Sequence, residues 1–99
     1  MTTVTKLRYC VYVLISLADG DFYVGFTTDL KQRLTSHFHG NSKATAPRRP
    51  FRLVHCEYYL AKEDAERRET YLKTAKGRRT LRLMLKDSLD EVRSSTSED

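Results

Sequence analysis

Two short apolar runs on either side of an acidic turn constrain this chain more than any other feature. The runs span residues 9–17 and 22–26, and Asp19, Gly20 and Asp21 lie between them. An Asp-Gly pair between apolar runs favours a β-hairpin, so we predict two antiparallel strands. The first strand is apolar on both faces, which is typical of a central strand that is covered on both sides.

Each predicted strand carries a tyrosine in a short motif, VYV around Tyr12 and YVG beginning at Tyr23. Tyrosine is common in strands, so packing of both side chains in the core is one interpretation. Gly25 is unusual inside a strand, and close approach of a ligand or of other backbone is one explanation for it.

A first helix is expected to begin after the cap signal at residues 28–29 and to run to about residue 38. Its apolar stripe consists of Leu30, Leu34 and Phe38. Arg33 and His37 lie on the same stripe, so helical spacing turns both side chains toward the sheet. A rim arginine and a hydrogen-bonded core histidine would be the structural interpretation of these two residues.

The remaining sequence predicts one more strand and two more helices. A loop over 40–50 leads into a strand at 51–59. A second helix begins at Glu63 and stops at Gly77, and a third covers residues 80–89. The predicted fold class is therefore α/β (α+β): a three-stranded, mainly antiparallel sheet flanked by three helices, in the order β-β-α-β-α-α.

The domain prediction divides the chain into three parts. Residues 1–7 form a flexible N-terminus, residues 8–89 the folded domain, and residues 90–99 a disordered acidic and Ser-rich tail. The tail holds four acids and one arginine, a net charge of −3, so the other 89 residues carry +8 of the total of +5. An excess of positive charge serves solubility as often as binding, and only clustering of the cations indicates an anionic partner.

Three predicted elements each place chemically capable side chains on an inward face. The hairpin supplies the two tyrosines, the first helix Arg33 and His37, and the second helix Glu69. A structural ion pair between Arg33 and Glu69 is one interpretation and a catalytic cluster is the other. The residues alone favour neither, because perturbed charges occur both in active sites and in structural networks.

The same residues resemble the GIY-YIG nuclease family in identity and spacing. Arg33 follows Tyr23 by ten residues, and His37 follows Arg33 by four. Glu69 lies in the segment RRETYL of the second helix. The resemblance covers about residues 8–86. The segment ERRETYLKTAKGRRTLR is similar to the small stand-alone members, which resemble the N-terminal nuclease domain of the excision-repair nuclease subunit.

The resemblance implies a divalent-metal-dependent endonuclease that hydrolyses DNA phosphodiester bonds. We expect it to recognise DNA structure rather than sequence and to act in DNA repair or recombination. Glu69 would hold a single Mg²⁺ or Mn²⁺ ion, since Mg²⁺ is commonly bound by one or two carboxylates with waters and phosphate oxygens. The catalytic set implied by the resemblance is Tyr12, Tyr23, Arg33, His37 and Glu69.

The resemblance also implies a role for each member of this set. Arg33 would stabilise charge on the scissile phosphate. Tyr12 would act as the general base or position it, with Tyr23 in support, and His37 would relay a proton or contact phosphate. A phenol with a reference pKa of about 10 is a poor base at pH 7 unless a cation lowers its pKa. Arg33 and the metal are the cations expected to do so.

Two departures from the family pattern stand out. Some members carry a lysine after the second triplet, where this chain has Phe26, and many carry an active-site asparagine that the stretch 76–82 lacks. These departures predict activity that is weak, narrow in substrate or absent. The missing asparagine favours the alternative function, a non-catalytic nucleic-acid-binding module on the same scaffold.

Clustered cations near the loop and the last two helices predict DNA as the partner, with RNA left open. The expected nucleic-acid-binding residues are Lys43, Arg48, Arg49, Arg52, Lys73, Lys76, Arg78 and Arg79, with Arg82 beside them.

No apolar run is long enough to span a membrane, and the first residues lack the apolar core of a secretory signal. We therefore expect a cytoplasmic monomer. Cys10 and Cys56 are expected to be buried free thiols, with a disulfide or a zinc site as the less favoured alternatives.

Overall fold

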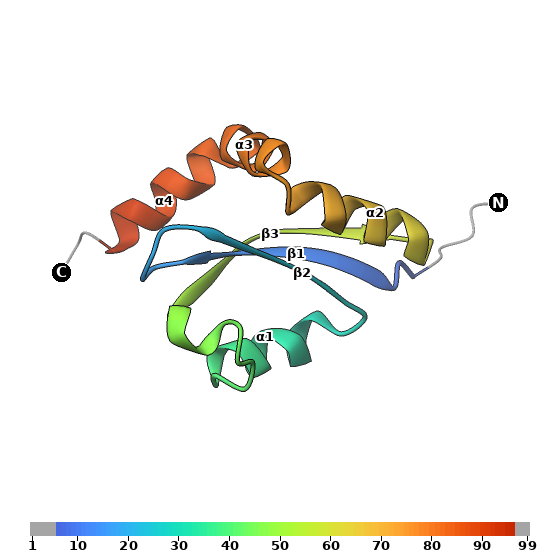
Figure 1. The fold of residues 1–99 in the computed structure, drawn as a ribbon, viewed down its shortest axis with the longest axis horizontal. Helices are drawn as coiled ribbons and strands as arrows, with labels where there is room; N and C mark the ends of the chain where they lie inside the picture. The colour runs from blue at the N-terminus through green and yellow to red at the C-terminus, as the bar shows by residue number, and fades with distance from the viewer. Residues whose placement is uncertain (1–5, 97–99) are drawn as a thin grey trace.

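The computed structural model describes residues 6–96 and contains one sheet with helices on both of its faces (Figure 1). The strands are β1 (Tyr9–Ser16), β2 (Phe22–Thr27) and β3 (Phe51–Tyr59). The helices are α1 (Leu30–Phe38), α2 (Lys62–Leu72), α3 (Ala75–Met84) and α4 (Lys86–Thr96), with a short 3₁₀ helix, η1 (Ala46–Arg48), before β3. The predicted α+β class and the order β-β-α-β-α-α are confirmed, and a fourth helix follows.

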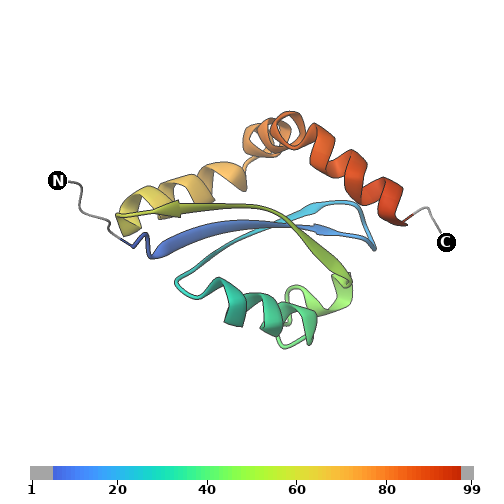
Figure 2. The same ribbon diagram turned by 180° about the vertical axis from the view of Figure 1, so that it is seen from behind.

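The sheet has the order β2-β1-β3, and both neighbours run antiparallel to β1. β1 is therefore the central strand, as its two apolar faces predict. Helix α1 and η1 cover one face, and α2, α3 and α4 form a layer over the other, as the view from behind also shows (Figures 1 and 2).

Alternation along β1 divides the core into two clusters. The larger cluster lies between the sheet and α2–α4, and its β1 members are Val11, Val13 and Ile15. The smaller cluster lies on the α1 face, and it contains Cys10, Tyr12, Leu14 and Phe51. Tyr23, Leu30 and Leu34 pack against this smaller cluster, so the predicted catalytic tyrosines share the α1 face.

A β-bulge in the pairing of β1 with β3 places Phe51 on the α1 face. Val13 pairs with His55, but Leu14 pairs with Leu53, so the register shifts by one residue. Since a shift of one residue moves every following side chain to the other face, Phe51 now pairs with Ser16 and joins the smaller cluster.

The prediction that the second helix ends at Gly77 is wrong. Helix α2 ends at Leu72, and α3 begins at Ala75 after Thr74, whose hydroxyl accepts a hydrogen bond from the Gly77 amide at 3.0 Å. Gly77 lies inside α3, where an added Cβ would overlap the carbonyl oxygen of Tyr71 and lie 2.6 Å from the Leu72 Cα. The glycine allows close packing of two consecutive helices rather than stopping one.

The predicted tail and third helix are also wrong in part. Residues expected to form one helix over 80–89 divide between α3 and α4 around the buried Leu85, and α4 continues through residue 96. Leu89 and Val92 lie three residues apart on α4 and are both buried in the larger cluster. This short apolar stripe orders a segment whose polar composition suggested disorder. Residues 97–99 and 1–5 of the predicted flexible ends lie outside the described residues.

Two predictions of burial fail at the surface. Phe38 was expected on the apolar stripe of α1, but it is 47% exposed at the end of that helix. Cys56 is exposed because it lies on the edge strand β3. Cys10 is buried as expected, and burial raises the pKa of its thiol to about 11.

Within residues 6–96, no helix has the length and apolar character needed to cross a membrane.

Replacing Gly77 by alanine should lower the melting temperature. Helix propensity alone favours alanine over glycine by about 1 kcal/mol. However, the new Cβ would collide with backbone atoms of α2, and overpacking of this kind typically costs about 1–3 kcal/mol. Thermal unfolding should show a fall of several degrees. Ser88→Ala, at an exposed position of α4, is the control and should change little. A higher melting temperature for Gly77→Ala would contradict the packing argument.

Candidate active site

The Tyr12 ring lies directly over Gly25, its partner in the β1–β2 pairing. A Cβ at position 25 would overlap the Cζ and Oη atoms of Tyr12. The missing side chain therefore makes room for the tyrosine ring, which is 1% exposed. The close approach at Gly25 is made by a side chain of the first motif, not by the ligand or backbone that the glycine suggested.

The Tyr12 hydroxyl lies between two side chains of α1. Arg33 Nε donates a hydrogen bond to Tyr12 Oη at 3.3 Å, and His37 Nε2 lies 2.8 Å from the same oxygen. Because a guanidinium only donates, the hydroxyl proton is free to point toward Nε2 of a neutral imidazole. That arrangement places the imidazole proton on Nδ1, which lies 2.9 Å from Thr45 Oγ1. Tyr12, His37 and Thr45 thus form a hydrogen-bonded chain from hydroxyl to imidazole to hydroxyl.

Helix α1 sets the positions of Arg33 and His37. The Asp29 carboxylate caps the helix by accepting a hydrogen bond from the Gln32 amide at 3.1 Å. Residues four apart lie on one side of a helix, so both polar side chains face the sheet. The prediction that these two residues point inward is confirmed, with Arg33 half-buried and His37 buried.

Aromatic rings surround the His37 imidazole. Its centroid lies 5.1 Å from that of Tyr23, 5.7 Å from that of Tyr12 and 6.4 Å from that of Phe51. Burial lowers the pKa of His37, and the charge of Arg33 lowers it further. The imidazole is therefore neutral at pH 7 and able to accept a proton.

The pKa of Tyr12 moves in the opposite direction from the one expected. Burial raises it to about 12, and the hydrogen bond from Arg33 lowers it by a smaller amount. The negative charge of Glu69 also raises it. Arg33 acts on this pKa in the expected direction, but burial outweighs it because the ring is almost fully desolvated.

Glu69 does not form an ion pair with Arg33. Its carboxylate lies 3.0 Å from Lys73 Nζ, one turn further along α2, and its side chain is 22% exposed. The structural interpretation of Arg33 and Glu69 as partners therefore fails. Glu69 is nevertheless near enough to Tyr12 for its charge to act on the hydroxyl.

The side chains near Glu69 could hold only a metal ion that needs few ligands from the protein. Within residues 6–96, no group of three or more acidic, histidine or cysteine side chains could hold a metal. A single carboxylate fits Mg²⁺, which keeps several waters and uses phosphate oxygens of the substrate rather than a protein cage. It does not fit a tetrahedral zinc site.

The two departures from the family pattern have clear positions. Phe26 pairs with Val11, so it faces the α2–α4 layer, and its ring stacks on Tyr9 with centroids 6.1 Å apart. It therefore lies on the opposite face of the sheet from Tyr12. The stretch 76–82, which lacks an asparagine, forms most of α3.

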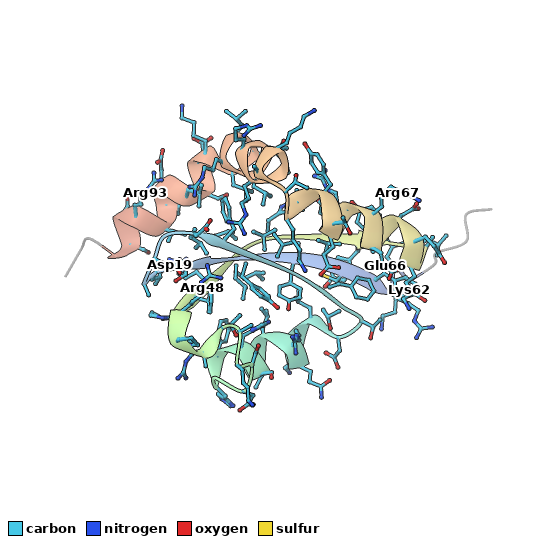
Figure 3. All side chains as sticks on the ribbon, viewed as in Figure 1. Asp19, Arg48, Lys62, Glu66, Arg67 and Arg93 are labelled. Carbon is cyan, nitrogen blue, oxygen red and sulfur yellow. The ribbon has the colours of Figure 1, made fainter. Side chains whose placement is uncertain are left out.

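Several of the predicted nucleic-acid-binding cations are held by acids of the protein. Arg48 binds Asp19 at 2.7 Å beside the hairpin turn (Figure 3), and Arg78 binds Asp21 at 2.7 Å. Lys73 pairs with Glu69, and the Arg49 guanidinium donates to the Ala46 carbonyl. Within the described part of the chain, the predicted cations without an ion pair are Lys43, Arg49, Arg52, Lys76 and Arg79.

Thr45 is the site residue that the sequence did not reveal. It lies in the loop between α1 and β3, it is buried, and it contacts the imidazole of His37. No periodicity or motif marks this position, because the contact depends on how the loop folds back onto α1.

Comparisons with known proteins identify the family to which the chain belongs. The family profile of the GIY-YIG catalytic domain matches residues 8–82. A UPF0213 protein of Streptococcus pneumoniae is 39% identical over 67 residues, which are 67% of each chain. A UPF0213 protein of Staphylococcus aureus is 37% identical over 75% of this chain and 90% of its own length. A UPF0213 protein of Bacillus halodurans, solved by NMR, is similar with a TM-score of 0.50 and 35% identity, over 77% of this chain and 83% of that one.

Replacing Thr45 by valine should disturb His37 without leaving a cavity in the loop. Valine has nearly the same shape but leaves the buried Nδ1–H without an acceptor, which typically costs about 1–3 kcal/mol. We expect this loss in urea unfolding. We also expect a shift of His37 toward the Nε2–H tautomer in long-range ¹H–¹⁵N spectra. Thr45→Ser keeps the hydroxyl and should retain both properties. An unchanged tautomer in Thr45→Val would show that Thr45 does not orient the ring.

Proposed function

Because the chain belongs to the GIY-YIG family, whose members are generally endonucleases acting on DNA, we propose that it is a divalent-metal-dependent DNA endonuclease. The single observation that carries the proposal is the Tyr12 hydroxyl held between Arg33 and His37. A structural core tyrosine needs one hydrogen-bond partner, whereas this one contacts a cation and a neutral base together.

A proton relay follows from these contacts. As a water attacks phosphorus, it gives a proton to Tyr12 Oη while the tyrosine gives its own proton to His37 Nε2. The imidazolium that forms keeps its Nδ1–H directed at Thr45. Tyr12 then never carries a full negative charge, which is consistent with a pKa of about 12.

Arg33 is suited to binding the scissile phosphate, whose oxygens gain negative charge during the reaction. Its side chain is half-buried, and only its Nε is used by Tyr12, so the terminal nitrogens can donate to phosphate oxygens. Hydrogen bonds from a partly desolvated guanidinium strengthen as negative charge develops on the oxygens. Tyr23, next to His37, would support the phosphate or the attacking water.

Glu69 is the residue proposed to hold Mg²⁺ or Mn²⁺. When bound, the ion would supply charge stabilisation to the phosphate and to the leaving oxygen. In its absence Lys73 neutralises the carboxylate, and the pair is exposed enough to open readily.

We propose DNA structure rather than sequence as the basis of recognition, with a role in DNA repair or recombination. The cations on the loop and on α3 suit phosphate contacts, which carry no sequence information themselves. The rival function is a binding module without turnover. It is favoured by the near-complete burial of the Tyr12 ring and by the lack of asparagine in α3. Binding of DNA without cleavage in Mg²⁺ and Mn²⁺ would support the rival.

Glu69→Gln should abolish cleavage and leave stability almost unchanged. The substitution removes the proposed metal ligand, but it breaks only an exposed i,i+4 ion pair worth about 0.3–0.5 kcal/mol. Cleavage of single-stranded, duplex, flap and branched DNA in Mg²⁺ or Mn²⁺ tests the first part, and thermal unfolding tests the second. Glu66→Gln removes the same charge from an exposed position of α2 and should cut normally. Full activity in Glu69→Gln would end the proposed metal role.

The pH profile should separate the relay from direct ionisation of Tyr12. His37 accepts a proton only when it is neutral, so kcat/KM should rise with pH through the lowered pKa of His37, below about 6.5, and then level off. His37→Asn should remove this acid limb together with most of the activity. His39→Asn, at an exposed histidine, should keep both. A rate that kept rising tenfold per pH unit from pH 7 to 9 would contradict the relay.

A further inference from the structure

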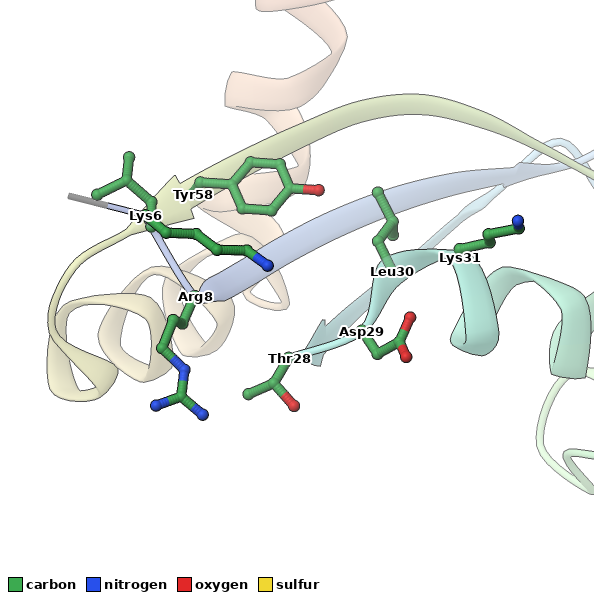
Figure 4. A pocket seen from close by; sticks show the side chains of 8 residues that line it. Lys6, Arg8, Thr28, Asp29, Leu30, Lys31 and Tyr58 are labelled. Atoms are coloured by element: carbon green, nitrogen blue, oxygen red, sulfur yellow. The ribbon is translucent and has the colours of Figure 1, made fainter. Parts of the chain in front are cut away.

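A concave site lies on the α1 face, outside the cluster of catalytic candidates. A pocket of about 520 Å³ opens where β1 begins and where β2 and β3 end (Figure 4). Its side chains come from four segments of the chain: the residues before β1, the β2–α1 connection, the first turn of α1 and the end of β3.

An aromatic ring forms one wall of this pocket. Tyr58 pairs with Cys10 on the face that carries Tyr12, and it is 45% exposed. Leu30, at the start of α1, lies across the pocket from it (Figure 4). A half-exposed ring that faces an apolar side chain offers a flat surface for a second planar group.

Three cations line the same pocket as the ring. Lys6, Arg8 and Lys31 line the pocket, and within residues 6–96 they form no ion pair. The acid of the pocket, Asp29, already accepts the hydrogen bond that caps α1. This contrasts with Arg48 and Arg78, whose charges are matched by Asp19 and Asp21. The pocket therefore combines a planar aromatic wall with an excess of positive charge, since three cations and one carboxylate line it.

We propose that this pocket binds one unstacked nucleotide of a single-stranded DNA segment, with the base against Tyr58 and the neighbouring phosphates near Lys6, Arg8 and Lys31. Stacking of a base on an aromatic side chain inside a basic groove is the usual basis of single-strand binding. The inference rests on the proposed function, which it deepens by naming the substrate class.

The position of the pocket indicates a continuous path for one strand. Tyr12 lies two residues beyond Cys10 on the same face of β1, about 7 Å along the strand. The pocket and Tyr12 are therefore close enough for neighbouring nucleotides of one strand to lie near both. Since a base in a duplex is stacked and paired, flap or branched DNA should be preferred to continuous duplex.

Single-strand binding by the full chain tests the pocket independently of cleavage. The probe is a fluorescein-labelled twelve-residue oligothymidylate, measured by anisotropy in EDTA. Tyr58→Thr keeps strand preference but removes the ring, and it should weaken binding roughly 5- to 150-fold. Tyr58→Phe should remain within twofold. Leu83→Ala, which removes an 81% exposed side chain from α3, is the control and should bind as the wild type does.

The salt dependence tests the cations. Arg8→Gln and Lys31→Gln should each reduce the slope of log K against log salt by about 0.7, the value for one phosphate of a single strand. Lys86→Gln makes the same charge change on α4 and should leave the slope unchanged.

The outcomes separate this inference from the proposed function. Wild-type affinity in Tyr58→Thr would overturn the pocket, and the proposed function would stand if that variant still cut DNA in Mg²⁺. Equal affinity for thymidine monophosphate and for the oligothymidylate would also overturn it, because the site would then be one for small molecules. Absence of both binding and cleavage in the wild type would overturn both.

Discussion

The packing of Tyr12 over Gly25 is the contact on which the rest of the site depends. The ring fills the space of the missing side chain, so its hydroxyl is held at a fixed position within the α1 face. Helix α1 then needs only its own spacing to bring Arg33 and His37 to that oxygen. A side chain at position 25 would displace the ring and separate all three groups.

Burial gives this cluster its chemical character. The Tyr12 phenol is too desolvated to ionise at neutral pH, and burial also keeps the neighbouring imidazole neutral. Two neutral groups that share a short hydrogen bond are suited to passing a proton, and the charge that results is carried by the imidazole rather than by the phenol. The role proposed for Tyr12 therefore depends on His37, and that of His37 on the loop that carries Thr45.

The hairpin turn has a second role, which concerns the positive charge of the chain. Its two aspartates bind arginines from opposite sides of the sheet, Arg48 of η1 and Arg78 of α3. Each pair fixes a neighbouring element and reduces the charge available to a ligand. The cations without an ion pair among residues 6–96 thereby become more significant, and three of them line the pocket that contains Tyr58. Counts of charged residues in the sequence do not distinguish these two groups.

The sequence by itself determined the hairpin, the central position of β1, the start of α1 and the inward direction of its two polar residues. Each depends on local spacing, since a strand repeats every two residues and a helix every 3.6. The same spacing carries the resemblance to the GIY-YIG family, and that resemblance implies the five catalytic candidates. Only the tertiary structure decided the end of α2, the order of residues 90–96, the partner of Glu69, the raised pKa of Tyr12 and the contact of Thr45 with His37. These features depend on contacts between segments far apart in the chain and on the removal of water, which no local pattern encodes.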